Sequence, residues 1–367
     1  MQLDGREPTL PPPATPYETE ALAFCRAWLS GQASFVLHTS GSTGTPKPIT
    51  LTRAQMRASA RLTGATFGLQ PGDHALCCLN IRYVAGVMML VRALELGLRL
   101  TIQEPTSNPL AAHAPAEPID FAAFVPLQLQ TMLDAGNAAT LALLNGMKAI
   151  LVGGAATSPA LEQSLQVITA PVYATYGMTE TVSHIAIRRL DGSGPDGLGA
   201  VDYFTALTGV TLGTDERGCL HITAAATNFE RIQTNDVIQF LDEHRTRFRL
   251  LGRADTIINS GGVKIQPERV ERLIETTLAR FGNAPRLFVA GLPDERLGQR
   301  VVAFFESYAP TPDQWTTVQD AVRAQIGPYA VPKEYRLLPT FAETPTGKID
   351  RKTSLAGFIN PAAQPDS

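Results

Sequence analysis

The sequence is short of the residues that mark disulfide, metal and signal sequences. Its four cysteines form no C-x-x-C pair, so it predicts neither a disulfide framework nor a zinc site and favours a reducing, cytoplasmic setting. The six histidines form no H-E-x-x-H motif. Residues 1–16 contain acidic residues and several prolines but no apolar core, so we expect no signal peptide.

Long hydrophobic runs and an excess of charge are also missing. The most apolar region, residues 76–100, is interrupted by Arg82, Arg92 and Glu95, so we expect no membrane span. The net charge is −3, which argues against a broad nucleic-acid-binding surface. Hydrophobic residues make up 44% of the chain and charged residues 18%, a balance that excludes a disordered chain. Only six of the 31 basic residues are lysines, so each lysine merits attention.

Alternating strand and helix patterns fill the first half of the chain. Strand patterns at 35–38, 49–51, 75–79, 98–102, 121–125, 149–152 and 171–176 alternate with helical patterns at 17–29, 52–67 and 84–96 and after residues 126 and 158. This alternation predicts an α/β domain with a largely parallel sheet. Thr52 and Gln55 have the spacing of a capping box at the start of the second helix.

The second half has a different texture. Residues 206–251 read as short strands joined by turns, which predicts a β-rich section. Helical patterns at 267–281 and 313–326 and strand patterns at 286–290 and 300–305 then predict a compact α+β unit. At about 150 residues per domain, 367 residues allow about two domains. We expect a large N-terminal domain, residues 1–254, and a small C-terminal domain, residues 255–367.

A Gly/Ser/Thr-rich loop carries the strongest chemical signal. It lies between two short strand patterns and consists of Thr39, Ser40, Gly41, Ser42, Thr43, Gly44, Thr45, Pro46 and Lys47. Glycines let successive backbone N–H groups converge on an anion, while the hydroxyls and the lysine add donors and charge, which suits a polyphosphate. It is not a Walker A loop, because Lys47 follows Pro46 and not a glycine. A flexible linker would need neither the flanking strands nor the Pro-Lys ending.

Four further motifs follow in order, and with the loop they resemble those of the adenylate-forming acyl-CoA synthetases, the AMP-binding enzymes. The motifs are Gly153-Gly154-Ala155, Tyr176-Gly177-Met178-Thr179-Glu180-Thr181, Gly252-Arg253-Ala254-Asp255 with the later Gly261-Gly262-Val263-Lys264, and Pro345-Thr346-Gly347-Lys348-Ile349-Asp350-Arg351. They resemble, in turn, the family's adenine segment, its aromatic-Gly-x-Thr-Glu motif, its hinge with the following loop, and its C-terminal lysine motif. The resemblance implies the adenylate-forming fold and a ligase that uses ATP, Mg²⁺, coenzyme A and a small carboxylic acid.

The nucleotide site must neutralise charge, because a carboxylate has to attack the α-phosphate of ATP. Tyr176 offers a flat face for adenine, and Thr179 offers a hydroxyl for the α-phosphate. Glu180 is a hard oxygen ligand suited to Mg²⁺. By resemblance, Asp236 and Arg253 reach the ribose. In the family, the ribose-binding aspartate ends a Thr-Gly-Asp turn, whereas this chain has Thr-Asn-Asp at that point. Asn tolerates a positive φ, so the turn would be preserved.

Lys348 is the residue that we expect to matter most for catalysis. By resemblance it reaches from the small domain to the α-phosphate and the carboxylate, and a point charge on a flexible stem suits a transient bridge. Asp255 resembles the family's hinge residue. After adenylation the small domain is expected to rotate, withdraw Lys348 and present the Gly261–Gly262 loop, with Lys264, to the thiol.

The acid-binding residues are less distinctive. Two segments are expected by resemblance to line the acid pocket, and they contribute Arg82, Tyr83, Ser183 and His184. A fatty-acid pocket would be purely apolar, so this mixture suits an aromatic acid with a second carboxylate. The same segments resemble those of the o-succinylbenzoate–CoA ligases of menaquinone biosynthesis. Either Arg82 or His184 pairs with that carboxylate, or Arg82 extends along a helix start and His184 is a satisfied strand residue.

Two other functions stay open. One is an adenylating enzyme for another aryl or acyl group that loads CoA or a separate carrier protein; the other is a nucleotide-binding regulator without catalysis. Lys348 and Glu180 speak against the regulator, which would need neither. The phosphate loop starts far earlier than in typical members, so an N-terminal subdomain is expected to be absent. A second copy of the chain, as a homo-oligomer, is one candidate cover for the sheet edge left behind.

Overall fold

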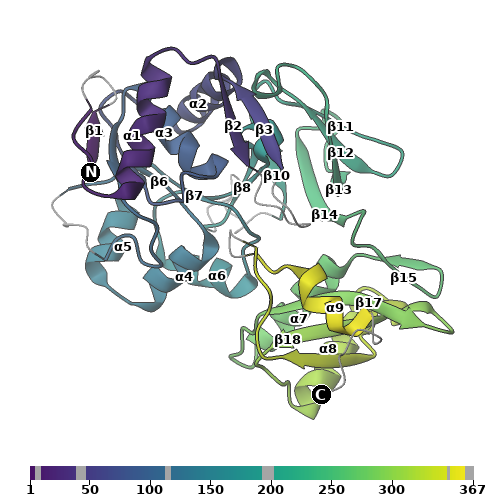
Figure 1. Ribbon diagram of the computed structural model, residues 1–367. Coiled ribbons are helices and arrows are strands. Elements are labelled where there is room, and N and C mark those ends of the chain that lie inside the picture. The colour runs from purple at the N-terminus through teal and green to yellow at the C-terminus, as the bar shows by residue number, and fades with distance from the viewer. Residues whose placement is uncertain (5–9, 39–46, 112–116, 192–201, 345–347, 360–367) are drawn as a thin grey trace, which may run out of the picture.

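The chain folds into a large part and a small part (Figure 1). The structure is a computed structural model that describes all residues except 5–9, 39–46, 112–116, 192–201, 345–347 and 360–367. Within the described residues, no helix is both long and apolar enough to cross a membrane. All four cysteines are buried and free of disulfide bonds.

A twelve-stranded sheet runs through the described residues of the large part, in the order β1-β5-β4-β6-β7-β8-β9-β10-β14-β13-β12-β11. Strands β5, β4, β6, β7 and β8 pair in parallel, whereas the strands from β8 to β11 and the β1–β5 pair are antiparallel. The parallel core and the β-rich section predicted from the sequence are both confirmed. The strands are β1 (Gln2–Asp4), β4 (His74–Cys77), β5 (Arg99–Ile102), β6 (Phe121–Phe124), β7 (Ala149–Val152), β8 (Val172–Gly177), β9 (His184–Arg189), β10 (Phe204–Ala206), β11 (Thr211–Thr214), β12 (Cys219–Thr223), β13 (Ile232–Phe240) and β14 (Arg247–Arg253).

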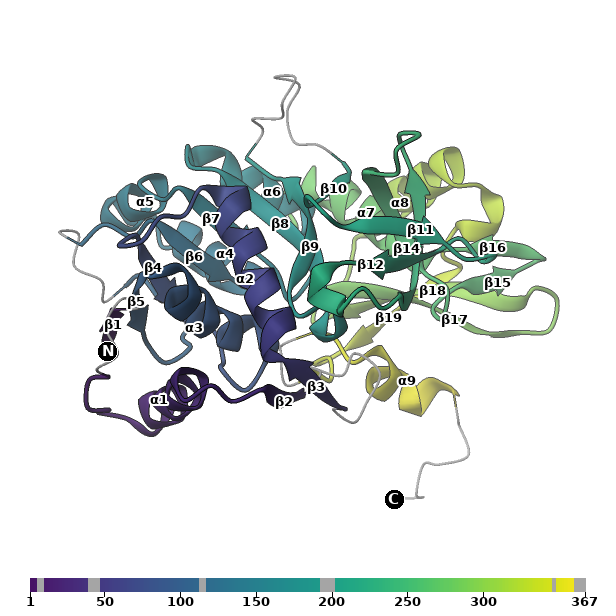
Figure 2. The ribbon, with the colours of Figure 1, turned by 90° about the horizontal axis from the view of Figure 1, so that it is seen from above.

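Helices cover both faces of the parallel strands, which is why most residues of those strands are buried (Figure 2). Alternate residues of β7 show this: Ala149 and Leu151 pack with α1 and α3, and Ile150 and Val152 pack with α4, α5 and α6. The helices are α1 (Pro16–Leu29), α2 (Arg53–Phe67), α3 (Val84–Leu96), α4 (Pro126–Asp134), α5 (Ala138–Asn145) and α6 (Pro159–Ser164), with short 3₁₀ turns at Leu165–Val167, Thr179–Thr181 and Ala225–Thr227.

A separate hairpin frames the predicted phosphate loop. Strands β2 (Ser34–His38) and β3 (Pro48–Thr52) are antiparallel, and the last residue of β2 pairs with the first of β3. Helix α2 then begins in the predicted capping box: the Thr52 N–H donates to Gln55 Oε1 at 2.9 Å, and the Gln55 N–H donates to Thr52 Oγ1 at 3.2 Å. In the sequence, residues 39–47 therefore join β2 to β3, and the capped helix α2 follows β3 directly.

The small part has its own sheet and core. Its strands run in the order β16-β15-β18-β17, and β19 pairs in parallel with residues 302–306 of β18. The elements are β15 (Ile258–Ser260), β16 (Val263–Ile265), α7 (Pro267–Ala279), β17 (Leu287–Asp294), β18 (Gly298–Glu306), α8 (Pro312–Gln325), a 3₁₀ turn (Pro328–Ala330), β19 (Glu334–Leu338) and α9 (Arg351–Ile359). The last strand of the large sheet ends at Arg253 and the first of the small sheet begins at Ile258, so Asp255 lies between them. The domain boundary at that residue stays a prediction.

The capping box gives a first prediction. We expect Thr52→Ala to lower the free energy of unfolding by about 1 kcal/mol, because the Gln55 N–H in the first turn of α2 loses its acceptor, Thr52 Oγ1. Urea unfolding followed by circular dichroism measures this. Thr66→Ala in the same helix is the control and should change stability by less than about 0.5 kcal/mol. Equal effects of the two substitutions would contradict the role of the cap.

Candidate functional site

Most of the predicted phosphate loop cannot be placed. Thr39, Ser40, Gly41, Ser42, Thr43 and Gly44 lie outside the described residues. Lys47 is described, is exposed and lies directly before β3. The loop's contribution to phosphate binding therefore stays a prediction from the sequence.

A hydrogen-bonded network joins three strands of the large sheet. Tyr176, near the end of β8, donates its hydroxyl to Asp236 Oδ2 at 2.6 Å. Arg253, the last residue of β14, donates from Nη1 to the other oxygen, Asp236 Oδ1, at 3.3 Å. Burial and the neighbouring Asp236 carboxylate raise the pKa of Tyr176, so its phenol keeps the proton that it donates. The three residues predicted for the adenine and the ribose are thus brought together.

The ring of Tyr176 is itself enclosed. It packs against Phe204 at 5.7 Å and edge-on against Phe248 at 5.4 Å between ring centroids, and the residue is 8% exposed. The hydroxyl contact with Asp236 is a role for Tyr176 that the sequence did not predict. Adenine stacking on its face stays a prediction.

Lys348 comes from the small part to this network. Burial, followed by the positive charge of Arg253, lowers its pKa, while the negative charge of Asp236 opposes that shift. The Lys348 side chain is partly buried, and its ammonium group forms no hydrogen bond or ion pair with a described residue. A partly buried cation beside the predicted ribose residues is therefore available to an anion.

The predicted hinge residue pairs with the same arginine. Arg253 Nε and Nη2 donate to the two oxygens of Asp255 at 2.9 and 2.8 Å, and Arg253 lowers the pKa of that carboxyl. Asn235, the residue before Asp236, lies inside β13 and does not have a positive φ. The expectation of a positive-φ turn at Asn235 is therefore corrected. Its strand pairing makes such a turn unnecessary, because the register places Asp236 opposite Arg253.

A small cluster of contacts holds the two parts together beyond the hinge. Glu162 on α6 accepts from Arg188 of β9 at 2.6 Å and from Arg272 of α7 at 3.2 Å. The second of these ion pairs crosses from the large part to the small one.

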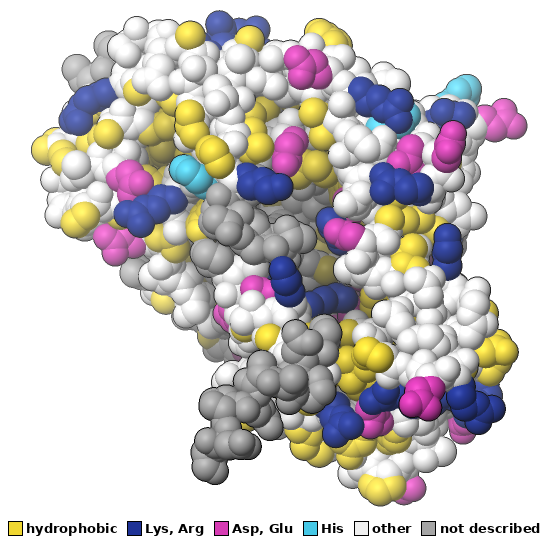
Figure 3. Space-filling view, turned by 45° about the vertical axis from the view of Figure 1, so that its right-hand side comes forward, with side chains coloured by type: hydrophobic (Ala, Val, Ile, Leu, Met, Phe, Trp, Pro, Cys, Tyr) yellow, Lys and Arg dark blue, Asp and Glu magenta, His cyan; other side chains and the backbone are white. Residues whose placement is uncertain are grey.

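On the face drawn in Figure 3, Lys and Arg side chains lie among those of Asp and Glu, and neither sign gathers into one large patch.

The predicted glycines serve close packing. A Cβ on Gly177 would clash with the Ser183 carbonyl oxygen, and a Cβ on Gly153 would lie 2.5 Å from Thr175 Oγ1. Gly154 has a φ of +85°, a conformation that favours glycine, and the exposed Ala155 follows it. These residues let the ends of β7 and β8 approach their neighbours.

Thr179 and Glu180 lie in the 3₁₀ turn directly after β8. Thr179 is buried, and Glu180 is partly buried. The Glu180 carboxylate has no hydrogen-bond or ion-pair partner among the described residues. A partly buried carboxylate that no described cation neutralises fits a magnesium ligand.

The Gly261–Gly262 pair forms the turn between β15 and β16. Both residues have a positive φ, +58° and +81°, as a tight hairpin turn requires. Gly261 packs against the ring of Tyr329, so a side chain at that position would clash. Lys264 is exposed on β16. Contact of this loop with a thiol stays a prediction.

The four residues predicted for the acid do not lie together. The Arg82 side chain is 73% exposed and its Nε lies 3.3 Å from Glu20 on α1. Tyr83 is the N-cap residue of α3 and is partly buried. Ser183 and His184 form a pair elsewhere, with Ser183 Oγ 3.2 Å from His184 Nδ1. A role of Arg82 and Tyr83 in acid binding stays a prediction.

Arg92 is the residue that sequence reasoning missed. It is 2% exposed in the middle of α3, and its guanidinium contacts Thr63 Oγ1 at 3.2 Å, Met89 Sδ at 3.4 Å and Ser183 Oγ at 2.7 Å. None of these partners is a carboxylate, and burial lowers the pKa of Arg92 to about 10. A buried cation without a negative partner is costly, so its presence points to an anionic ligand. The available signal was a single arginine inside an apolar helical run.

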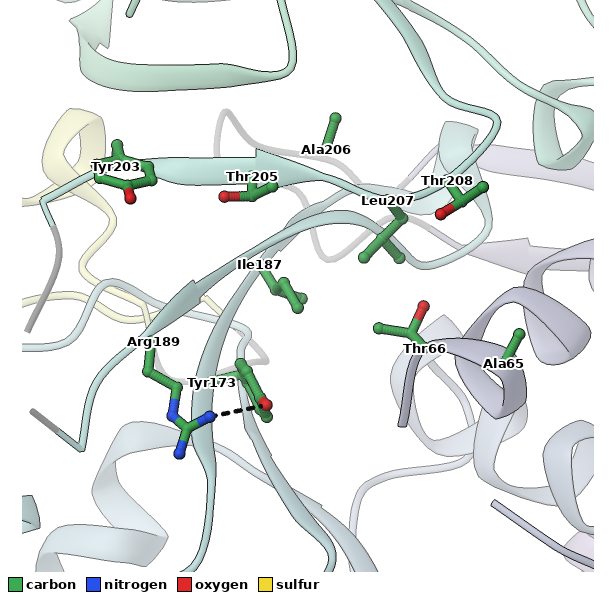
Figure 4. A pocket seen from close by; sticks show the side chains of 10 residues that line it. All are labelled: Ala65, Thr66, Tyr173, Ile187, Arg189, Tyr203, Thr205, Ala206, Leu207 and Thr208. Carbon is green, nitrogen blue, oxygen red and sulfur yellow. Dashed lines mark hydrogen bonds between the residues drawn. The ribbon is translucent and has the colours of Figure 1, made fainter. Parts of the chain in front are cut away.

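A cavity of about 550 Å³ lies between the end of α2 and strands β8, β9 and β10 (Figure 4). Its lining comes from the end of α2, from β8, β9 and β10, and from the segments next to β10: Ala65, Thr66, Tyr173, Ile187, Arg189, Tyr203, Thr205, Ala206, Leu207 and Thr208. The Arg189 guanidinium lies across the Tyr173 ring and donates to its hydroxyl at 3.1 Å. None of the residues predicted for the site lines this cavity.

Comparison with known proteins identifies the family. A family model described as AMP-binding enzyme matches residues 18–220, and a model described as AMP-binding enzyme C-terminal domain matches residues 273–348. The chain therefore belongs to the AMP-binding enzyme family and has the adenylate-forming enzyme fold. The family assignment made from the motifs is confirmed.

Individual relatives narrow the likeness. An acyl-CoA synthetase (AMP-forming)/AMP-acid ligase II-like protein from Dyadobacter fermentans, solved by crystallography, is 41% identical with a TM-score of 0.64 over 97% of this chain and 99% of that one. The 2-succinylbenzoate–CoA ligase of Listeria monocytogenes is 27% identical over 90% of this chain and 72% of the ligase. The o-succinylbenzoate CoA synthetase of Bacillus subtilis, solved with its acyl-adenylate intermediate, shares the fold at 20% identity and a TM-score of 0.71, over 86% of this chain and 68% of that one.

Arg92 gives a prediction about stability. We expect Arg92→Met to leave the free energy of unfolding unchanged or to raise it, because the substitution removes a buried charge that has no carboxylate partner. Denaturant unfolding of the two proteins measures the difference.

The control is Arg188→Met, which removes an arginine that is also buried but is paired with Glu162 at 2.6 Å. That variant should lose about 3 kcal/mol, because a buried carboxylate is left with less compensation. A loss of that size for Arg92→Met would show that Arg92 serves the fold and not a ligand.

Proposed function

We propose that the protein is an AMP-forming acid–CoA ligase that acts on o-succinylbenzoate in menaquinone biosynthesis. The observation that carries the proposal is the position of Lys348, a cation from the small part, beside the Tyr176–Asp236–Arg253 network of the large part. The names of the relatives from Listeria monocytogenes and Salmonella typhimurium, both 2-succinylbenzoate–CoA ligases at 27% identity, support the choice of acid.

The first step joins the acid to AMP. One carboxylate oxygen of the acid attacks the α-phosphorus of ATP, and pyrophosphate leaves with the electron pair of the broken P–O bond. The Asp236 carboxylate, held by Tyr176 and Arg253, accepts hydrogen bonds from the ribose hydroxyls. The Lys348 ammonium group attracts both the carboxylate of the acid and the α-phosphate of ATP. This attraction is stronger where the group is shielded from water. Thr179 adds a hydroxyl for the α-phosphate.

Magnesium would be held by Glu180. Its carboxylate is partly buried and has no partner among the described residues, which fits a hard oxygen ligand. When bound, the ion supplies charge neutralisation for the phosphate oxygens.

The second step transfers the acyl group to coenzyme A. The thiolate sulfur attacks the acyl carbon, and AMP leaves with the electrons of the acyl–phosphate bond. We propose that the small part rotates about Asp255 between the two steps, so that Lys348 leaves and the Gly261–Gly262 turn and Lys264 come to the thiol. That movement must break the Arg272–Glu162 ion pair, which joins the two parts in the present arrangement.

Arg92 supports an acid that has a second carboxylate. A monocarboxylic acid would bring its only negative charge to the α-phosphate and leave the buried guanidinium uncompensated. An acid with another carboxylate neutralises Arg92 while its first carboxylate reacts. Arg82, paired with Glu20 at the surface, is less suited to this role.

The acid can be tested directly. We expect the purified protein with ATP and Mg²⁺ to release pyrophosphate with o-succinylbenzoate and, with CoA present, to form its thioester. Fatty acids and plain benzoate should give rates at least tenfold lower, because neither compensates Arg92. Release that depends on a carrier protein would favour an enzyme that loads carriers, and no release with any acid would favour a nucleotide-binding regulator.

Lys348 separates the two steps. We expect Lys348→Ala to lower the rate of pyrophosphate release by about a hundredfold or more, because a charge that stabilises the transition state is lost. Conversion of preformed acyl-AMP and CoA into thioester should be nearly unchanged. Lys333→Ala, which changes an exposed lysine of the small part, is the control and should affect neither step. Equal loss of both half-reactions in Lys348→Ala would contradict the rotation.

A further inference from the structure

The ion pair between α6 and α7 joins the large part to the small one, and its two partners are held differently. Glu162 Oε1 accepts hydrogen bonds from Arg188 at 2.6 Å and from Thr157 at 2.7 Å, both in the large part. Glu162 Oε2 accepts from Arg272 Nη2 at 3.2 Å. The carboxylate is therefore fixed to the large part, whereas the arginine moves with the small part.

Glu162 presents a permanent negative charge to α7. Burial opposes its ionisation, but the hydrogen bond and the charge of Arg188 outweigh burial and lower the pKa of Glu162. A second ionised carboxylate that α7 brings to this contact is therefore repelled by the first.

Helix α7 does bring a second carboxylate. Glu275 follows Arg272 by three residues and Glu271 by four, so the three side chains share one face of the helix. Glu271 is satisfied inside the small part, because its oxygens accept from the Val289 N–H at 2.7 Å and from Arg351 at 2.8 Å. Glu275 is partly buried and forms no hydrogen bond or ion pair with a described residue. The contact between the two parts thus contains a carboxylate that no described side chain pairs with.

The surroundings of Glu275 favour its protonated form. Burial raises the pKa of Glu275 to about 7, and the negative charge of Glu271 adds to the shift. Glu162 acts in the same direction from across the contact, while Arg272 opposes both. The other elements packed against α7, namely α8, β14 and β17, contribute no such charge among the described residues. The carboxyl group of Glu275 therefore titrates near neutral pH.

Separation of the two parts changes the surroundings of only one of these α7 carboxylates. Glu271 keeps Val289 and Arg351 as partners, because all three belong to the small part. Glu275 loses the nearby charge of Glu162 and the cover of α6, so its pKa falls toward the ordinary range of a glutamate. Near neutral pH, the present arrangement therefore binds a proton that the separated arrangement releases.

We infer that Glu162, Arg272 and Glu275 form a proton-sensitive latch, which holds the small part in its present position at low pH and releases it as the pH rises. This inference rests on the proposed function, in which the small part rotates between the two steps. The direction follows from linkage, because a falling pH favours the arrangement that binds the proton more tightly.

The pH window of the latch follows from the same carboxyl group. The preference for the present arrangement is complete below the ordinary pKa of a glutamate and is lost as the pH rises through about 7. In the proposed order of steps, low pH thus favours adenylation, and higher pH favours the rotation that precedes thioester formation.

Fluorescence energy transfer between the two parts tests the latch in the full chain. Ala138→Cys on α5 and Thr317→Cys on α8 provide exposed positions for the dyes, whereas the four natural cysteines are buried. We call the present arrangement docked. From pH 8 to pH 6, the ratio of docked to separated protein should rise about tenfold, as expected when the pKa of one group differs in this way between two states.

Three variants identify the group that responds. Glu275→Gln keeps the size of the side chain but cannot ionise, so the docked ratio should change by less than about twofold between the two pH values. Arg272→Gln removes the ion pair and should lower the docked ratio about twofold to fivefold at pH 6. Glu295→Gln, which changes an exposed glutamate of the small part, is the control and should keep the tenfold response.

The outcomes distinguish the latch from the rotation on which it rests. An unchanged pH response in Glu275→Gln would overturn the latch. If ATP, o-succinylbenzoate and CoA change the transfer efficiency but pH does not, the latch is wrong and the rotation stands. If no addition changes the efficiency at any pH, the rotation fails and the latch fails with it. Pyrophosphate release in the same samples reports separately on the proposed function.

Discussion

The Asp236 carboxylate is the contact on which the nucleotide end of the molecule depends. One oxygen accepts a hydrogen bond from the Tyr176 hydroxyl on β8, and the other accepts one from Arg253 on β14. The carboxylate thereby links strands from two halves of the twelve-stranded sheet. Arg253 in turn holds Asp255 with two hydrogen bonds. A single carboxylate thereby positions the end of the large part and the first residues of the connection to the small part.

A second constraint is the cost of burying Arg92. A packed interior strongly disfavours an ion without a counter-charge, and an apolar side chain at that position would be easier to accommodate. The protein keeps the arginine and directs Ser183 and His184 toward it through a strained Val182. Stability is thus given up around Arg92, whereas both oxygens of the Asp236 carboxylate at the other end of the site accept hydrogen bonds. Such an imbalance is expected where binding energy is needed.

The elements with local signals were predictable from the sequence. The capping box at Thr52 and the apolar strand Ala149–Val152 depend on neighbouring residues, and the structure places both as expected. The helix Ala138–Asn145 was missed, since its Asn-capped start has weak periodicity. The pairing of β10 with both β9 and β14 was not predictable, because it joins segments about 18 and 42 residues apart through contacts that no local pattern encodes.

The site was predictable only where chemistry is carried by a motif. Tyr176, Asp236, Arg253 and Lys348 come together as the motifs suggested, although the hydroxyl contact of Tyr176 depends on the strand register. Arg92 could not be distinguished from a surface arginine, because its burial depends on how α2 packs on α3. Arg82 was the more obvious cation in the sequence, yet Glu20 on α1 pairs with it at the surface.

The central claim is that this chain uses ATP to activate an acid at its carboxylate with release of pyrophosphate. Phosphorus NMR of a reaction with ATP, Mg²⁺, CoA and o-succinylbenzoate tests it most directly. The account predicts that the signals of AMP and pyrophosphate grow in equal amounts while those of ATP decline, only when the acid is present. Formation of ADP and inorganic phosphate, or AMP formation that does not depend on the acid, would contradict it.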